Sequence, residues 1–88
     1  MTVQFKRNLD GYTFVAPSRR QYKKYDVYVG DKYITSFGDN RFSQYKDRIG
    51  YYAHMNNNSQ ERKRLYYKRH GLLSSRDTPK YFSHKYLW

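Results

Sequence analysis

The chain has 88 residues, which is enough for one small domain, because a chain of this length buries only roughly 60–65% of its unfolded surface. Its 18 Lys and Arg exceed its 7 Asp and Glu, and the resulting net charge of +11 favours polyanions or acidic protein surfaces as partners. The sequence has no Cys, which excludes disulfides, thiolate metal sites and a cysteine nucleophile. Twelve Tyr indicate that aromatic burial supplies most of the core.

The positive charge is concentrated in two segments. Residues 1–25 and residues 59–76 each carry six cations against one carboxylate, a net charge of +5 apiece. Residues 26–58 sum to zero, and residues 77–88 add +1. No apolar run approaches the roughly 20 residues of a membrane span, and the N-terminus lacks a secretory signal, so we expect a soluble protein that is not exported.

The first predicted segment is a basic arm. Residues 1–22 contain the turn-forming pairs Asp10-Gly11 and Pro17-Ser18 around a short alternating stretch, Tyr12 to Val15. This pattern predicts one edge strand at most. We therefore divide the chain into an N-terminal arm, residues 1–22, that lies against a partner, and a single small domain, residues 23–88.

A β-hairpin is predicted next. Two β-branched and aromatic runs, residues 25–29 and 32–37, are separated only by Gly30-Asp31. Two such runs joined by two residues with Gly first are typical of a hairpin with a type II′ or I′ turn. Asp39 or Asn40 then begins a short predicted helix that ends near residue 48 and places its rings, Phe42 and Tyr45, on one side.

Two further helices follow in the prediction. Asn58-Ser59-Gln60-Glu61 resembles a capping box and begins a basic helix that runs to His70, with Gly71 as its C-cap. Thr78-Pro79 then provides the N-cap and first residue of a short aromatic helix, 80–88. The predicted fold is α+β: a small antiparallel hairpin or three-stranded meander packed by one basic helix and a short C-terminal aromatic helix.

A series of short motifs in residues 23–88 resembles a known group of viral proteins. The motifs, in order, are Lys23-Lys24-Tyr25-Asp26-Val27, Ser36-Phe37-Gly38, Tyr45-Lys46-Asp47, His54-Met55-Asn56, Arg62-Lys63-Arg64-Leu65-Tyr66, Arg69-His70 and Phe82-Ser83-His84-Lys85-Tyr86-Leu87-Trp88. They are similar to a family of small, basic, functionally uncharacterised proteins encoded by nucleocytoplasmic large DNA viruses. The Asn-rich connector, 56–58, and residues 1–22 depart from the family pattern. The resemblance implies a viral origin and a place in the particle or near its genome.

Cations and rings alternate in the predicted basic helix. Helical periodicity places Arg62, Tyr66 and Arg69 along one strip, where guanidinium groups can neutralise phosphates and tyrosines can stack on bases. The predicted contacts to nucleic acid or another acidic partner are Arg19, Arg20, Lys23, Lys24, Arg62, Lys63, Arg64, Tyr66, Lys68 and Arg69. The alternative is a solvated basic face whose Arg stems cover neighbouring rings.

The C-terminal aromatic residues suggest a protein interface, because Tyr and Arg are enriched in buried interface centres. The predicted interface residues are Tyr81, Phe82, Tyr86, Leu87 and Trp88. A small chain with more rings than its own core can hold is expected to be completed by neighbours in an assembly.

Neither a metal site nor a catalytic site is predicted. The separations of 16 and 14 residues between His54, His70 and His84 match no compact ligand pattern. The carboxylates that would serve a nuclease are Asp39, Asp47, Glu61 and Asp77, and each lies within two residues of a cation, as in ordinary surface pairing. We therefore expect no cofactor and no enzymatic activity, with an endonuclease as the third hypothesis.

The leading hypothesis is a non-enzymatic structural or accessory component of the virion, either a minor capsid protein or a genome-associated one. Its partners would be capsid or other virion proteins and, through its basic segments, DNA or RNA. The alternative is a protein that contacts the phosphate backbone of DNA or RNA outside the particle, in the host cytoplasm or nucleus.

Overall fold

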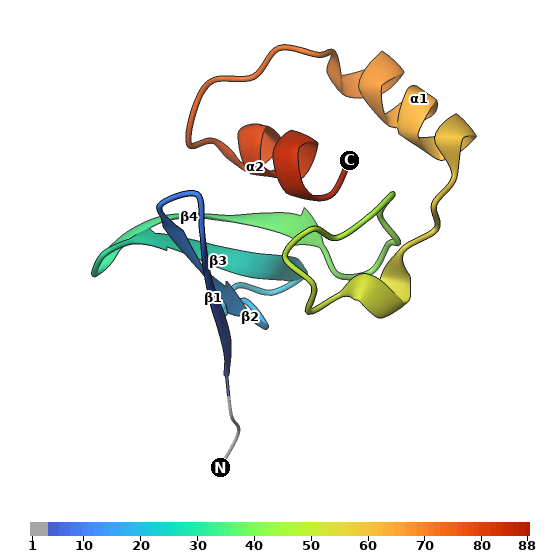
Figure 1. Ribbon diagram of the computed structural model, residues 1–88. Helices are drawn as coiled ribbons and strands as arrows, with labels where there is room; N and C mark the ends of the chain where they lie inside the picture. Colours follow the sequence, from blue (N-terminus) through green and yellow to red (C-terminus); the bar gives the residue numbers. More distant parts are fainter. Residues whose placement is uncertain (1–3) are drawn as a thin grey trace.

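The computed structural model describes residues 4–88, which form a four-stranded antiparallel sheet and two α-helices. The strands neighbour one another in chain order: β1 (Phe5–Leu9), β2 (Tyr12–Ala16), β3 (Lys23–Val29) and β4 (Lys32–Asp39). A 3-10 turn, Ala53–Met55, precedes α1 (Gln60–His70) and α2 (Pro79–Tyr86). Helix α2 packs against β4, whereas α1 stands farther from the sheet (Figure 1). The predicted α+β fold class is confirmed, and no helix within residues 4–88 is long and apolar enough to cross a bilayer.

The N-terminal segment, within residues 4–22, contributes two strands to the sheet. Residues 1–3 lie outside the described part of the chain, but β1 and β2 belong to the same sheet as β3 and β4. Asp10-Gly11 is the turn between β1 and β2, and its φ values of 56° and 85° are the left-handed pair that a type I′ turn requires. The sequence pattern missed β1 because the three central residues of this edge strand are exposed and polar.

The β3–β4 hairpin was predicted correctly. Val29 lies opposite Lys32, so Gly30-Asp31 is a two-residue turn. Near the other end of the pair, Gly38 allows a close approach. A Cβ there would lie 3.0 Å from both Leu87 Cδ1 and Lys24 Cβ, so glycine lets the chain after α2 pack directly on β4.

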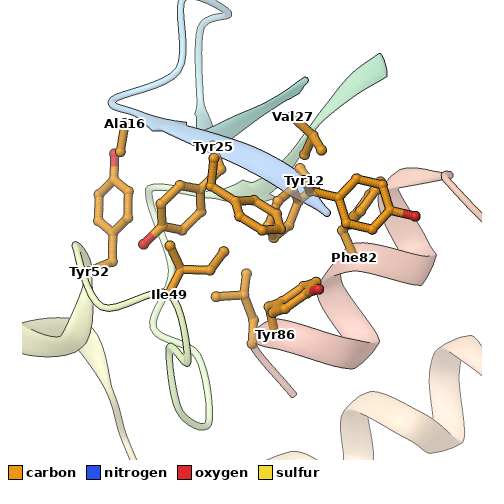
Figure 2. Packing of buried hydrophobic residues seen from close by; sticks show 11 residues of the cluster. Tyr12, Ala16, Tyr25, Val27, Ile49, Tyr52, Phe82 and Tyr86 are labelled. Carbon is orange, nitrogen blue, oxygen red and sulfur yellow. The ribbon is translucent and has the colours of Figure 1, made fainter. Parts of the chain in front are cut away.

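The core is mainly aromatic and lies between the sheet and α2 (Figure 2). Phe14 on β2 is fully buried, with its ring centroid 4.8 Å from that of Tyr86 and 6.1 Å from that of Phe37. Phe82 of α2 stacks on Phe37 at 5.5 Å. Burial of each such side chain contributes about 1.5–3 kcal/mol. Phe82, Tyr86 and Leu87 therefore complete the protein's own core, which leaves little of these three side chains exposed for the predicted interface.

The prediction of a helix over residues 40–48 is wrong, because this segment is irregular. Its backbone groups bond to distant backbone groups, as Lys46 N does to Leu87 O at 3.0 Å, and to side chains. Asp47 Oδ1 accepts a hydrogen bond from Ile49 N at 2.8 Å, and Asn56 Oδ1 accepts one from Asp47 N at 2.7 Å. Asp and Asn side chains of this kind compete with helical hydrogen bonds.

Both remaining helices begin at polar caps, as predicted, with one shift of register. The N-cap of α1 is Ser59, not Asn58, and Ser59 Oγ accepts a hydrogen bond from Arg62 N. Gly71 is the C-cap of α1. Helix α2 begins after Thr78, whose hydroxyl accepts from Tyr81 N, and Pro79 occupies its first turn.

Candidate functional site

A groove of about 900 Å³ opens between α1, α2 and the loop that follows β4, and we call it the basic groove. Its lining residues are Lys23, Lys24, Gly38, Asp39, Arg41, Phe42, Ser43, Arg62, Leu65, Tyr66, Lys68, Arg69, His70, Pro79, Lys80, Ser83, Leu87 and Trp88. Seven of these are Lys or Arg, and Asp39 is the only acidic side chain among them. The groove is thus strongly positive, because Arg41 already neutralises Asp39 in an ion pair of 2.8 Å.

Helix α1 forms one wall of the basic groove. Arg62, Leu65, Tyr66 and Arg69, spaced three and four residues apart, share one face of α1 and line the groove. This is the strip that helical periodicity predicts, with Leu65 added. Lys68 and His70 border the same space.

Two rings and an imidazole attach α1 to the rest of the molecule. The rings of Tyr66 and Trp88 stack at 4.7 Å and 8°. Tyr66 Oη lies 2.9 Å from His84 Nδ1, and His84 Nε2 lies 2.9 Å from the carbonyl of Gly71. Because that carbonyl can only accept, we assign the imidazole proton to Nε2, which makes Nδ1 the acceptor of the Tyr66 hydroxyl.

Burial shifts both partners of this hydrogen bond towards their neutral forms. It raises the pKa of Tyr66 to about 12 and lowers the pKa of His84 below its usual value. Tyr66 is only 8% exposed, and its ring and hydroxyl are occupied by Trp88 and His84. Tyr66 therefore positions α1, and little of its surface is left for the predicted contact with an acidic partner.

Lys24 is likewise an interior residue, at 1% exposed, which leaves little of it accessible for the predicted contact with an acidic partner. Its Nζ donates hydrogen bonds to Phe42 O at 2.9 Å and to Gln44 Oε1 at 2.6 Å. Burial lowers the pKa of Lys24 to about 8. This buried amine holds the loop after β4 in place beneath the groove.

That loop supplies two groove residues that the sequence did not reveal as a site, Arg41 and Phe42. The Arg41 guanidinium bonds both oxygens of Asp39 and lies 4.2 Å from the ring centroid of Tyr22. Phe42 is 63% exposed, although the sequence predicted that it shares a helix side with Tyr45. Lys80, which also lines the groove, was missed because it belongs to α2.

The other predicted binding residues are divided by the fold. Lys23, Arg62, Lys68 and Arg69 line the basic groove together, whereas Arg19, Arg20, Lys63 and Arg64 do not. Arg19 pairs with the buried Asp26, with Nε 3.3 Å from Oδ2. The Lys63 ammonium lies 4.6 Å from the ring centroid of Tyr45. Of the predicted interface residues, Leu87 and Trp88 line the groove, and Tyr81 packs half-buried against the core.

The candidate catalytic carboxylates lie apart from one another in different settings. Asp47 is buried and accepts hydrogen bonds from Tyr25 Oη, Ile49 N and Tyr52 N, while Asp77 accepts one from Tyr12 Oη. Glu61 is exposed in the first turn of α1. Across residues 4–88, no three His, Asp or Glu side chains gather in a way that would hold a metal ion.

The chemistry that this arrangement offers is anion binding beside exposed apolar side chains. Charged donors of five side chains, Lys23, Arg62, Lys68, Arg69 and Lys80, face one concave space that also contains the Phe42 ring. Comparison of the chain with protein-family models, curated proteins and solved structures gave no match.

Proposed function

We propose that this chain is a non-enzymatic protein that binds the phosphate backbone of nucleic acid in the basic groove, as a genome-associated component of a large DNA virus particle. The observation that carries the proposal is the concentration of cations in one groove whose single acidic side chain, Asp39, is already paired with Arg41. Lys and Arg are the side chains that neutralise phosphates.

A nucleic-acid partner is favoured over an acidic protein surface by the side chains that are exposed at the groove. Three of the five predicted interface residues, Phe82, Tyr86 and Leu87, are used in the core. The large exposed ring that accompanies the groove cations, Phe42, is the kind of side chain that stacks on bases.

The salt dependence of binding tests the groove. The affinity for a labelled oligonucleotide is measured across salt concentrations for the unmodified protein and for the double variant Lys68→Gln/Arg69→Gln. Each phosphate contact contributes about 0.7–0.9 to the slope of log affinity against log salt, so the double variant should reduce that slope by about 1.5.

The matched control is Arg20→Gln/Arg64→Gln, which removes the same charge from exposed side chains outside the groove lining. We expect it to change the slope by much less than the groove variant. A flat slope in the unmodified protein, or equal losses in the two double variants, would reject the groove as the binding site.

The resemblance to proteins of nucleocytoplasmic large DNA viruses supports a location in the particle. Under this proposal, purified particles contain the protein at a fixed ratio to the major capsid protein, as quantitative mass spectrometry would measure. Binding to nucleic acid combined with absence from particles would favour the alternative, a protein that acts on DNA or RNA in the host cell.

A further inference from the structure

Resting on the proposed function, we infer that the basic groove takes single-stranded rather than double-stranded nucleic acid, with phosphates on the groove cations and a base stacked on Phe42. Two observations carry this inference: the concave placement of the cations, and a large exposed ring fixed among them.

The first observation is the direction in which the α1 cations face. Arg62 and Arg69 line the groove together with Arg41 and Phe42 of the loop after β4, and Arg62 Nη1 donates a hydrogen bond of 3.2 Å to Ser43 Oγ of that loop. A duplex is commonly read by a helix or β-ribbon that projects into its major groove, about 12 Å wide, and the duplex is stiff, with a persistence length of about 150 base pairs. A stiff duplex therefore suits outward-facing cations, whereas a flexible single strand can follow a concave surface.

The second observation is the setting of Phe42. Its ring is 63% exposed, yet its backbone carbonyl accepts a hydrogen bond of 2.9 Å from the buried Lys24 Nζ. The neighbouring Arg41 is itself tied to Asp39 and packed over Tyr22. The loop thus holds an apolar ring at the groove without burying it, which is the arrangement of a stacking platform.

Trp88 offers a second ring at the same groove. It is half-buried, it lines the groove, and it stacks on Tyr66 in a nearly parallel pair. Unpaired bases stack on such rings whatever their sequence, because every base has a π-face. In a duplex the bases already stack on each other, so neither ring has a free base to meet.

Three labelled probes of about twelve nucleotides test the inference: single-stranded oligothymidylate, its duplex with the complementary strand, and an abasic strand with the same phosphates. At equal salt we expect oligothymidylate to bind at least about tenfold more tightly than the other two. Phe42→Ala should lower its affinity about tenfold, towards that of the abasic strand, and Phe42→Trp should preserve it.

Leu73→Ala is the control, because Leu73 is an apolar side chain of still greater exposure that does not line the basic groove. It should leave all three affinities unchanged. Equal or tighter binding of the duplex, or equal binding of the abasic strand, overturns the inference but leaves phosphate binding in place. Failure of all three probes to bind rejects the proposed function as well.

Discussion

Three buried polar side chains hold the irregular segment that carries part of the basic groove. Lys24 donates to Phe42 O and to Gln44, Gln44 Nε2 donates to Tyr52 O, and Asp47 accepts from two backbone amides and the Tyr25 hydroxyl. No buried side-chain nitrogen or oxygen within residues 4–88 is left without a partner. Removal of any one of these side chains should cost more stability than the net value of its hydrogen bonds, because its buried partners would be left without a donor or acceptor.

We predict that Asp47→Ala lowers the free energy of unfolding by about 3 kcal/mol, since it leaves the amides of Ile49 and Tyr52 and the Tyr25 hydroxyl without their acceptor. Chemical denaturation measures the change. Asp39→Ala, at an exposed ion pair, should cost about 1 kcal/mol or less. Similar losses in the two variants would contradict the structural role of Asp47. Metal-dependent nuclease cleavage by the unmodified protein that is lost in a fully stable Asp47→Ala protein would favour the nuclease hypothesis.

Among the elements, α1 is the one with the least support from the sheet. It is joined to α2 mainly through Tyr66 and Tyr67, whose hydroxyls meet the ring and the carbonyl of His84. Its other anchors are hydrogen bonds from the exposed Gln60 and Arg62 to Tyr45 and Ser43. A short helix held by so few contacts opens at a lower free energy than the core strands.

We predict that Tyr66→Ala loosens α1 while the sheet stays folded. Loss of the Trp88 stack and the His84 hydrogen bond should lower the hydrogen-exchange protection of α1 amides roughly tenfold, with little change in β2 and β3. Leu65→Ala, on the same face of α1, removes a partly exposed side chain and should have a small effect. Uniform loss of protection in helix and sheet would show that α1 is part of the cooperative core.

The elements that were predictable are those whose signals are local. Gly30-Asp31 and Thr78-Pro79 specify a turn and a helix start within a few residues, and both predictions are confirmed. The structure of residues 40–58 depends on partners far along the chain, such as Tyr25 for Asp47, and no local pattern reveals them. The groove shares this property: Arg62 and Arg69 were predictable from helical spacing, but Phe42 and Lys80 join them only through tertiary packing.

At the scale of the whole molecule, the tyrosines buried in the structure make its stability depend on pH. Burial raises the pKa of Tyr25, Tyr52, Tyr66 and Tyr86, and the value for Tyr66 is about 12. Tyrosines of the unfolded chain ionise at about pH 10, so above that pH the folded state binds more protons than the unfolded state. The tyrosine contribution to stability is therefore complete below about pH 10 and is lost as the pH rises towards 12.

Lys24 has the opposite effect at lower pH, where it makes the free energy of unfolding increase with pH. Its pKa of about 8 in the folded state lies below the value of about 10.4 for an unfolded chain, so between these values the unfolded state binds the extra proton. We predict that the free energy of unfolding rises from about pH 8 to 10 and falls above it. Denaturation at a series of pH values measures this, and Lys24→Met should abolish the rise while keeping the fall.

The packing of Phe14 and Phe37 against Phe82, together with the 2.7 Å hydrogen bond from Tyr86 Oη to Asp10, has a consequence for synthesis. A nascent chain can pair all four strands once residue 39 has left the ribosome, and Ile49 and Tyr52 then cover part of the apolar face, but Phe14 and Phe37 lack their α2 partners until residues 82–87 follow. The sheet is therefore fully covered only after α2 has been synthesised. A chain truncated before Phe82 would expose the rings of Phe14 and Phe37 to solvent and to other nascent chains.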